Sequence, residues 1–249
     1  KCLSSPCMTN KEVAELKELL SSPKKIVIVP HKGPDGDAMG STLALKLLLE
    51  REHHYVHLIS PNDFPGFLKW MPSSKDIIIY DRETEKSDRL IEEADLIFTL
   101  DFNSLSRAGD MKKSLENAPG TFVMIDHHQQ PDDYARYTYS DVSICATCQM
   151  VYHFIEKIGW TEKITGQIAT CLYTGIMTDT GSFRYRSTTS ITHQVIAHLI
   201  EKGADNTSIH ENIFDTNSYS QLQLLGEALK NLVVVEEFRT AYITLSQEE

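Results

Sequence analysis

The pattern of apolar and polar positions predicts alternating strands and helices from the first strand as far as Ile158. Three apolar runs, at residues 25–30, 95–100 and 121–125, are rich in Ile, Val and Phe, and each stops at an acid or a histidine. Such runs are typical of strands that are buried on both faces of a parallel sheet. We expect strands at 25–30, 55–60, 77–80, 96–100 and 121–125, a helix at 40–50, and a charged turn or helix at Glu92 and Glu93. The fold class that follows is α/β, a parallel β-sheet flanked by helices.

The periodicity becomes mostly helical after Thr161 and then changes again near the end of the chain. Helices are predicted at residues 164–177, 192–202, 206–214 and 218–232, and a hairpin with strands within 232–236 and 239–245. A two-stranded hairpin is marginal alone, so we interpret it as the opening of a second α/β domain that is truncated here. The domains expected are an extension with a first helix (1–23), a main domain (24–215), a linker helix (216–232) and the start of a second domain (233–249).

Composition favours an ordinary enzyme over a membrane or secreted protein. The 249 residues are 41% hydrophobic and 24% charged, which is enough apolar content for a sizeable core. No apolar stretch approaches the ~20 residues of a membrane helix, and residues 1–8 lack the apolar core of a signal peptide. We therefore expect a cytoplasmic protein without membrane association.

The cysteines and the net charge narrow the range of functions. Five cysteines are an odd number, which favours reduced thiols over a disulfide framework. The single CxxC at Cys145 and Cys148 is a weak zinc or redox signal, and small buried residues at the start of a helix are the more natural interpretation. A net charge of −11 argues against a surface for duplex DNA but leaves a small anionic substrate open.

Four short segments concentrate hard metal ligands, and three of them directly follow the apolar runs. The segments are residues 31–37, 100–103, 125–128 and 178–181. Because the carboxyl ends of parallel strands meet in one crevice, ligands far apart in sequence should converge there. Carboxylates grouped in this way need cations to offset their repulsion. Considered one at a time, each of these acids could instead form a turn or cap a helix without binding a metal.

The spacing within these segments indicates two metal ions. His31, Asp35 and Asp37 are expected in a loop between a strand and a helix, where the two carboxylates can serve different ions. Asp101, alone at the end of a strand, suits a bridging carboxylate, and the second ion would be completed by His127 and Asp179. Oxygen ligands with one histidine per ion favour Mn²⁺, with Mg²⁺ or Co²⁺ as substitutes.

These motifs resemble the DHH phosphoesterase family from about residue 24 to residue 187. The resemblance rests on His31-x-x-x-Asp35-x-Asp37, on Asp101, and above all on Asp-His-His at residues 126–128, with Asp-Thr-Gly at 179–181 as a fourth motif. Flanking residues, including Gly-Ser-Phe-Arg-Tyr at 181–185, resemble the NrnA-like subgroup of bifunctional oligoribonucleases and pAp phosphatases.

The resemblance implies a role for each of these residues. One ion would be held by His31, Asp35 and Asp101, and the other by Asp37, Asp101, His127 and Asp179. Asp126 would orient a histidine, and His128 would contact the substrate phosphate and is a candidate proton donor. Arg107 and Arg184 are candidates to pair with phosphate oxygens, with surface salt bridges as the alternative.

The activity implied is Mn²⁺-dependent hydrolysis of short oligoribonucleotides from the 3′ end, of pAp, or of both, by hydroxide attack at two metals. Exopolyphosphatase, pyrophosphatase and cyclic-dinucleotide-product phosphodiesterase are alternatives within the family. A nucleotide- or metal-binding module without turnover is the alternative of another class, because the Gly-Gly-Gly-His segment of the family's second domain is not in these residues. Self-association as a homodimer is left open.

Overall fold

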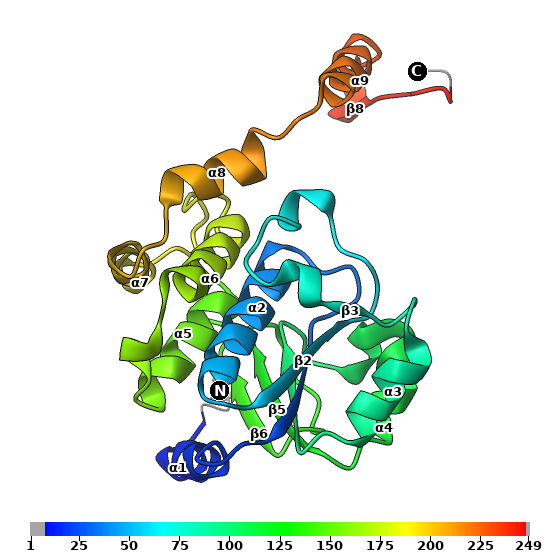
Figure 1. Ribbon diagram of the computed structural model, residues 1–249. Helices are drawn as coiled ribbons and strands as arrows, with labels where there is room; N and C mark the ends of the chain where they lie inside the picture. The colour runs from blue at the N-terminus through cyan, green and yellow to red at the C-terminus, as the bar shows by residue number, and fades with distance from the viewer. Residues whose placement is uncertain (1–7, 248–249) are drawn as a thin grey trace. The chain divides into compact units, whose positions relative to one another are not determined.

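A six-stranded, all-parallel sheet forms the centre of the computed structural model, which describes residues 8–247 (Figure 1). The strands lie in the order β3-β2-β1-β4-β5-β6, and every neighbouring pair is parallel. Their bounds are β1 (Lys25–Val29), β2 (Tyr55–Ser60), β3 (Ile78–Ile79), β4 (Leu96–Leu100), β5 (Thr121–Asp126) and β6 (Tyr137–Ser140). All five residues of β4, near the middle of the sheet, are buried, which explains why this strand is a continuous apolar run.

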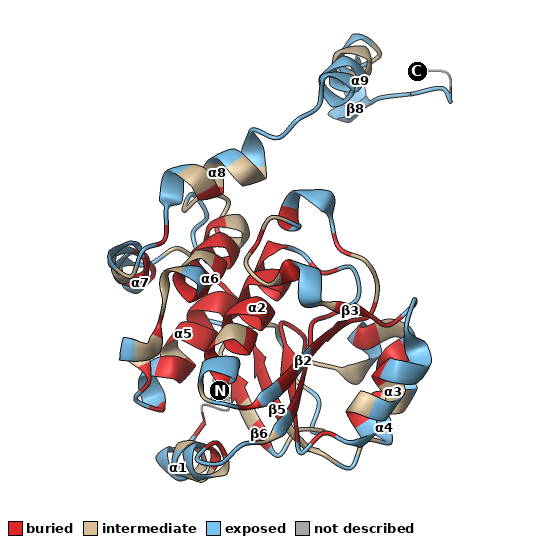
Figure 2. Ribbon diagram, in the orientation of Figure 1, coloured by how far each residue is buried: buried red, intermediate tan, exposed pale blue. Residues whose placement is uncertain are grey.

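Helices cover both faces of the sheet. The helices of the described residues are α1 (Asn10–Leu19), α2 (Gly36–Arg51), α3 (Thr84–Glu92), α4 (Lys112–Glu116), α5 (Thr147–Lys157), α6 (Gly166–Asp179), α7 (Ser190–Glu201), α8 (Asn206–Phe214) and α9 (Tyr219–Lys230), and α9 lies in a separate compact unit. On one face, Ile91 of α3 and Leu115 of α4 pack with Val27 and Ile97 of the sheet in one apolar cluster. On the other, α2, α5 and α6 pack against one another, and their buried residues are seen in Figure 2.

Close packing of α2, α5 and α6 depends on two glycines and a cysteine. A Cβ built on Gly175 of α6 would lie 2.1 Å from Cys148 Sγ, and one on Gly40 of α2 would lie 2.8 Å from the same sulfur. The Cys148 side chain therefore occupies the notch that the two glycines leave. The interpretation of the CxxC segment as small buried residues at a helix start is confirmed, because Cys145, Cys148 and Cys171 are buried free thiols. Cys2 and Cys7 lie outside the described residues.

The α/β class is confirmed, and several predicted bounds need correction. Helix α2 begins at Gly36, four residues before the predicted start, because Asp35 caps it. The charged segment at Glu92 and Glu93 is the end of a full helix, α3, and the strand predicted at 77–80 keeps only Ile78–Ile79 as a short edge strand. Strand β6 was not predicted, because its Tyr-Thr-Tyr-Ser sequence is short and carries only two large apolar side chains.

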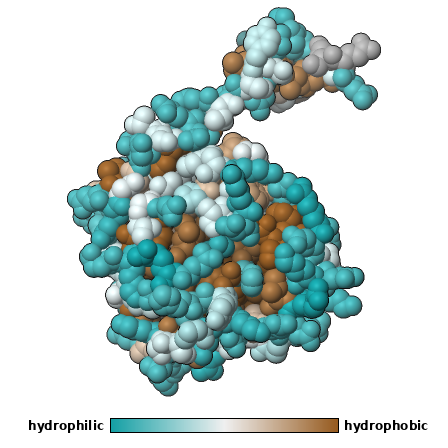
Figure 3. Space-filling model, in the orientation of Figure 1, coloured by the Kyte–Doolittle hydropathy of each residue, from teal (hydrophilic) through white to brown (hydrophobic). Residues whose placement is uncertain are grey.

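A second compact unit begins at His210 and is described by itself. It contains α9 and an antiparallel pair, β7 (Val233–Val235) with β8 (Thr240–Tyr242), so the predicted hairpin is confirmed with shorter strands. Many of its apolar side chains are exposed, including Leu229, Val234 and Phe238, and Figure 3 shows apolar residues on its visible face. The domain boundaries proposed from the sequence stay predictions. Within residues 8–247, no helix has both the length and the apolar character needed to span a bilayer.

Candidate metal centre

The candidate ligands gather at the carboxyl edge of the sheet, where β1, β4 and β5 lie side by side. His31 follows β1, Asp101 follows β4, and His127 follows β5. Two carboxylates come from helix ends at the same edge, Asp37 from the first turn of α2 and Asp179 from the last residue of α6. The strand order therefore brings together residues that are up to 148 positions apart in the chain, from 31 to 179.

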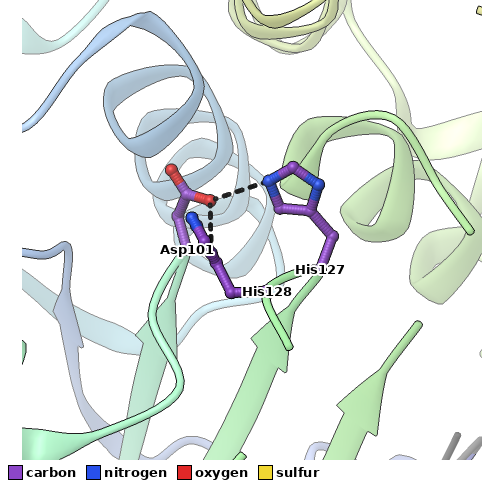
Figure 4. A group of neighbouring side chains, drawn as sticks. All are labelled: Asp101, His127 and His128. Carbon is purple, nitrogen blue, oxygen red and sulfur yellow. Dashed lines mark ion pairs between the residues drawn. The ribbon is translucent and has the colours of Figure 1, made fainter. Parts of the chain in front are cut away.

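Asp101 stands at the middle of this group and is 2% exposed. Its Oδ2 lies 3.6 Å from His31 Nε2, and its Oδ1 lies 3.6 Å from His127 Nε2. Figure 4 shows His127 and His128 converging on that Oδ1 atom. Its backbone has a φ of 65°, a left-handed conformation that a residue other than glycine adopts at a cost of about 1–3 kcal/mol. The fold thus holds a strained residue so that its two oxygens face two different histidines.

The two histidines that face Asp101 are both oriented by backbone carbonyls. His31 Nδ1 lies 2.9 Å from the carbonyl oxygen of Lys32, and His127 Nδ1 lies 3.2 Å from that of Ile144. Because a carbonyl only accepts, each Nδ1 carries the hydrogen in these bonds. In the neutral form of each ring, Nε2 is then an acceptor that faces a carboxylate oxygen at 3.6 Å, and a cation between the two atoms would bind both.

Asp35 and Asp37 do not share one loop, because Asp35 caps helix α2 and Asp37 lies within that helix. Asp35 is the N-cap of α2, and its Oδ1 accepts from the backbone N–H groups of Asp37 (3.0 Å) and Ala38 (3.1 Å). Asp37 was predicted in the loop but lies inside the first helical turn, with 1% of its surface exposed. The cap at Asp35 starts the helix early, and this turns the two carboxylates in different directions.

The carboxylate of Asp37 is held by the first turn of another helix, α5. Its Oδ2 accepts from the backbone N–H of Thr147 at 2.6 Å, and its Oδ1 accepts from that of Cys148 at 2.8 Å. These N–H groups have no partner within their own helix, so a carboxylate is a natural acceptor for them. Asp37 Oδ2 also lies 4.0 Å from His127 Nε2, and Asp179 Oδ2 lies 3.6 Å from that nitrogen.

Three sets of residues offer ligand atoms that all lie within 4.8 Å of one another: His31, Asp35 and Asp101; Asp37, His127 and Asp179; and Asp101, His127 and His128. Imidazole nitrogen with carboxylate oxygen suits Mn²⁺ or Mg²⁺ better than a thiolate-type zinc site. The structure thus brings together all six residues predicted as ligands. The donor set fits divalent cations.

The buried carboxylates of the site repel one another, and a bound cation would offset this repulsion. Burial, followed by repulsion from Asp37 and Asp35, raises the pKa of Asp101 well above its ordinary value. Burial likewise raises the pKa of Asp37, and burial with the charges of Asp37 and Asp35 raises that of Asp179 to about 7. Carboxylates this close remain ionised at neutral pH only if a cation offsets their repulsion.

Asp126 and His128 form a second feature of the site. Asp126 is fully buried, and its two oxygens accept from His128, one from the backbone N–H at 3.1 Å and the other from Nδ1 at 2.6 Å. This hydrogen bond is the main cause that raises the pKa of His128. His128 therefore keeps a proton to higher pH than a free histidine, with its ring about one-third exposed.

The two candidate arginines, Arg107 and Arg184, have different surroundings in the structure. Arg107 lies in the 3₁₀ segment η3 (Leu105–Met111), and its carbonyl oxygen accepts from the backbone N–H of Lys32 at 2.7 Å. Its charge is close enough to lower the pKa of His128. Arg184 is exposed and donates from Nε to the carbonyl oxygen of Gly181 at 2.7 Å. Arg107 is thus placed beside the site, whereas Arg184 is bonded to its own turn.

The residue that sequence reasoning missed is Thr147. Its hydroxyl donates to Asp101 Oδ1 at 2.9 Å, and its backbone N–H holds Asp37. The sequence offers only a weak signal for it, a threonine between two cysteines at the start of a predicted helix.

The chain is similar in sequence to known proteins. The chain is 31% identical over 221 residues to the bifunctional oligoribonuclease and PAP phosphatase NrnA of Thermus thermophilus, covering 88% of this chain and 62% of that protein. It is 27% identical to a probable NrnA of Streptococcus mutans, covering 90% of this chain and 66% of that protein. The chain thus spans about two thirds or less of the length of these relatives.

Solved structures also share the fold of this chain. An exopolyphosphatase-related protein from Bacteroides fragilis superimposes with a TM-score of 0.94 at 41% identity, covering 98% of this chain and 72% of that one. A putative family II inorganic pyrophosphatase of Methanococcus jannaschii shares the fold, with a TM-score of 0.56 at 19% identity, covering 75% of this chain and 60% of that one. The DHH family, N-terminal domain, matches residues 25–176, more than half of the sequence. The expected resemblance is therefore confirmed, and the chain belongs to the DHH family.

Proposed function

We propose that this chain carries the metal-binding and catalytic core of a phosphoesterase that hydrolyses short oligoribonucleotides, pAp or both with two divalent cations, Mn²⁺ by preference. The observation that carries the proposal is Asp101, whose two oxygens face the Nε2 atoms of two different histidines at 3.6 Å. A carboxylate with this arrangement suits a bridge between two cations. The names of the relatives support the substrate class.

The residues divide into two ligand sets around Asp101. His31 and Asp35 would hold one ion with Asp101, and Asp37, His127 and Asp179 the other. When bound, two divalent ions activate water near neutral pH and stabilise negative charge on a phosphoryl group. The protein contributes rigidity, because α2, α6 and the ends of three strands fix the ligands.

His128 and Arg107 are the groups proposed to act on the substrate. The bond from His128 Nδ1 to Asp126 directs the opposite nitrogen, Nε2, away from Asp126, where its N–H can donate to a phosphate oxygen. The raised pKa suits His128 to deliver a proton to the leaving oxygen. Arg107, beside His128, would pair with a phosphate oxygen of the same substrate. Arg184 stays a weaker candidate for this role.

A second candidate substrate is polyphosphate or pyrophosphate. The structural relative at 41% identity is described as exopolyphosphatase-related, and this favours the alternative over a cyclic-dinucleotide product. A binding module without turnover is the candidate of another class, since the chain covers only part of its relatives' length. Cytoplasmic location, homodimer formation and lack of duplex DNA binding stay predictions.

One panel of assays separates these candidates. Product formation is measured with Mn²⁺ on pAp, on a labelled RNA dinucleotide and on polyphosphate, for the parent, for Asp101→Asn and for Asp81→Asn, an exposed control beyond the edge strand. We expect AMP and mononucleotides from the parent and the control, and loss of both in Asp101→Asn. Equal activity in Asp101→Asn would refute the mechanism. Phosphate from polyphosphate alone would establish the second candidate, and tight Mn²⁺ binding without any product would establish the binding module.

A further inference from the structure

The first residue of α5, Thr147, joins the two buried carboxylates of the metal centre. Its side chain is fully buried, and its hydroxyl lies 2.9 Å from Asp101 Oδ1. Its backbone N–H lies 2.6 Å from Asp37 Oδ2. One residue thus contacts the carboxylate proposed to bridge the ions and a carboxylate proposed to bind only one of them.

The direction of the Thr147 hydroxyl bond is fixed by chemistry. Thr147 Oγ1 donates to Asp101 Oδ1, and it must do so when bound cations keep this carboxylate ionised, because an ionised carboxylate only accepts. Such charge-assisted bonds are about twice as strong as neutral ones. Threonine is β-branched, and its side chain has few rotamers within a helix, so the donor is held in place without help from solvent.

The oxygen that Thr147 contacts is the one that both histidines after β5 approach. Asp101 Oδ1 lies 3.6 Å from His127 Nε2 and 3.8 Å from His128 Nδ1, whereas Oδ2 faces His31. Rotation of the carboxylate about its last bond would exchange these partners. A fixed donor on Oδ1 opposes that rotation and keeps each oxygen toward its own ligand set.

We propose that Thr147 is a positioning residue whose hydroxyl fixes the rotation of the Asp101 carboxylate, so that its two oxygens serve the two ligand sets. The inference rests on the proposed function, because it concerns the carboxylate shared by the two ions. Thr147 does not touch the cations or the substrate in this proposal. It acts through Asp101, as hydrogen-bond partners of metal ligands commonly do.

The test compares Thr147→Val, which replaces the hydroxyl by a methyl of similar size, with Thr147→Ser, which keeps the hydroxyl. Mn²⁺ binding to the metal-free chain is measured by calorimetry, without any assay of turnover. Partners of this kind usually contribute ~10–100-fold to metal affinity, so we expect Thr147→Val to weaken Mn²⁺ binding by that factor and Thr147→Ser to stay near the parent. Turnover of Thr147→Val should recover as Mn²⁺ is raised toward saturation.

The matched control is Thr42→Val. Thr42 is equally buried, and its hydroxyl donates within its own helix, to the carbonyl oxygen of Ala38 at 2.7 Å. It should lose some stability but bind Mn²⁺ like the parent. If Thr147→Val does not fold, the pair Thr147→Ser and Thr147→Ala gives the same comparison, because those two differ only in the hydroxyl.

The outcomes separate the inference from the proposed function. Parent-like Mn²⁺ affinity in Thr147→Val, or a loss in Thr147→Ser as large as that in Thr147→Val, would overturn the positioning role and leave the proposed function intact. Failure of the parent to bind Mn²⁺ at all would overturn the proposed function and this inference with it. A loss in Thr147→Val that Thr147→Ser does not share would establish the role of the hydroxyl.

Discussion

Substitution of Gly175 by alanine tests whether close helix packing positions the metal ligands. Gly175 lies in α6 where that helix contacts α2. An added Cβ would lie 2.1 Å from Cys148 Sγ, 2.9 Å from Asp37 Oδ1 and 3.0 Å from Asp37 Cα. The new methyl group would therefore press on the sulfur that fills the notch and on a predicted ligand together.

The size of the effect follows from these distances. Non-bonded heavy atoms are comfortable at about 3.5–4.0 Å, so the 2.1 Å contact requires a shift of roughly 1.5 Å by the sulfur or by α6. Overpacking typically costs ~1–3 kcal/mol, and so short a contact places this site in the upper part of that range, at ~2–3 kcal/mol, whereas the better helix propensity of alanine returns ~0.8–1.0 kcal/mol. We expect a net loss of ~1–2 kcal/mol in the free energy of unfolding. For a chain of this size the melting temperature should fall by ~2–8 °C.

The assay is thermal unfolding of the metal-free chain, followed by Mn²⁺ titration. Three variants are compared: Gly175→Ala, Cys148→Ala, and the double variant, in which the sulfur is absent. The double variant should be less destabilised than the sum of the single ones, because removing the sulfur relieves the worst contact. Gly226→Ala is the matched control, since nothing lies within 4 Å of a Cβ at that helical position.

Two results would refute this reasoning. A melting temperature of Gly175→Ala equal to or above that of the parent would mean that the helices adjust without cost. Strict additivity in the double variant would mean that Cys148 is not the group that the methyl meets. Mn²⁺ binding by Gly175→Ala should also be weakened, because Asp37 Oδ1 lies within 2.9 Å of the added atom.

Three further predictions concern charge and metal. Because the pKa of Asp179 is raised to about 7, the folded metal-free chain binds a proton there well above the pH at which the unfolded chain does. Asp179 should therefore make the metal-free chain more stable as pH falls from about 7 toward ~3.9. Asp179→Asn should flatten this dependence of the melting temperature on pH, and an unchanged dependence would contradict the raised pKa of Asp179. Asp126→Asn should lower the pKa of His128, so the alkaline limb of the rate profile should move to lower pH; an unmoved limb would remove His128 as the proton donor. Chelation should remove ~2.7 kcal/mol from the free energy of unfolding of a chain that had been held at free Mn²⁺ 100 times its Kd. The melting temperature should fall accordingly, and Mn²⁺ but not Na⁺ should restore it.

The sequence alone determined the strands that end at His31, Asp101 and Asp126, because buried parallel strands are local apolar runs with recognisable ends. It also offered the six candidate ligands, since a metal site needs specific residue types and three of these six, His31, Asp101 and His127, directly follow strands. The start of α2 was missed, although Asp35 is a good capping residue, because a Gly- and Pro-containing segment also suits a loop. The CxxC segment was correctly assigned to a helix start, but nothing local indicated what that helix contacts.

Only the tertiary structure decided how these residues meet. The order β1-β4-β5 places Asp101 between two histidines, and that order results from long-range pairing, which no local pattern encodes. The same is true of Thr147, which meets Asp37 across 110 residues of sequence and Asp101 across 46. Local periodicity specifies which face of an element is buried, whereas the partner of a buried polar group depends on packing between distant elements. The candidate ligands could thus be chosen from the sequence, whereas the contacts that orient them could not.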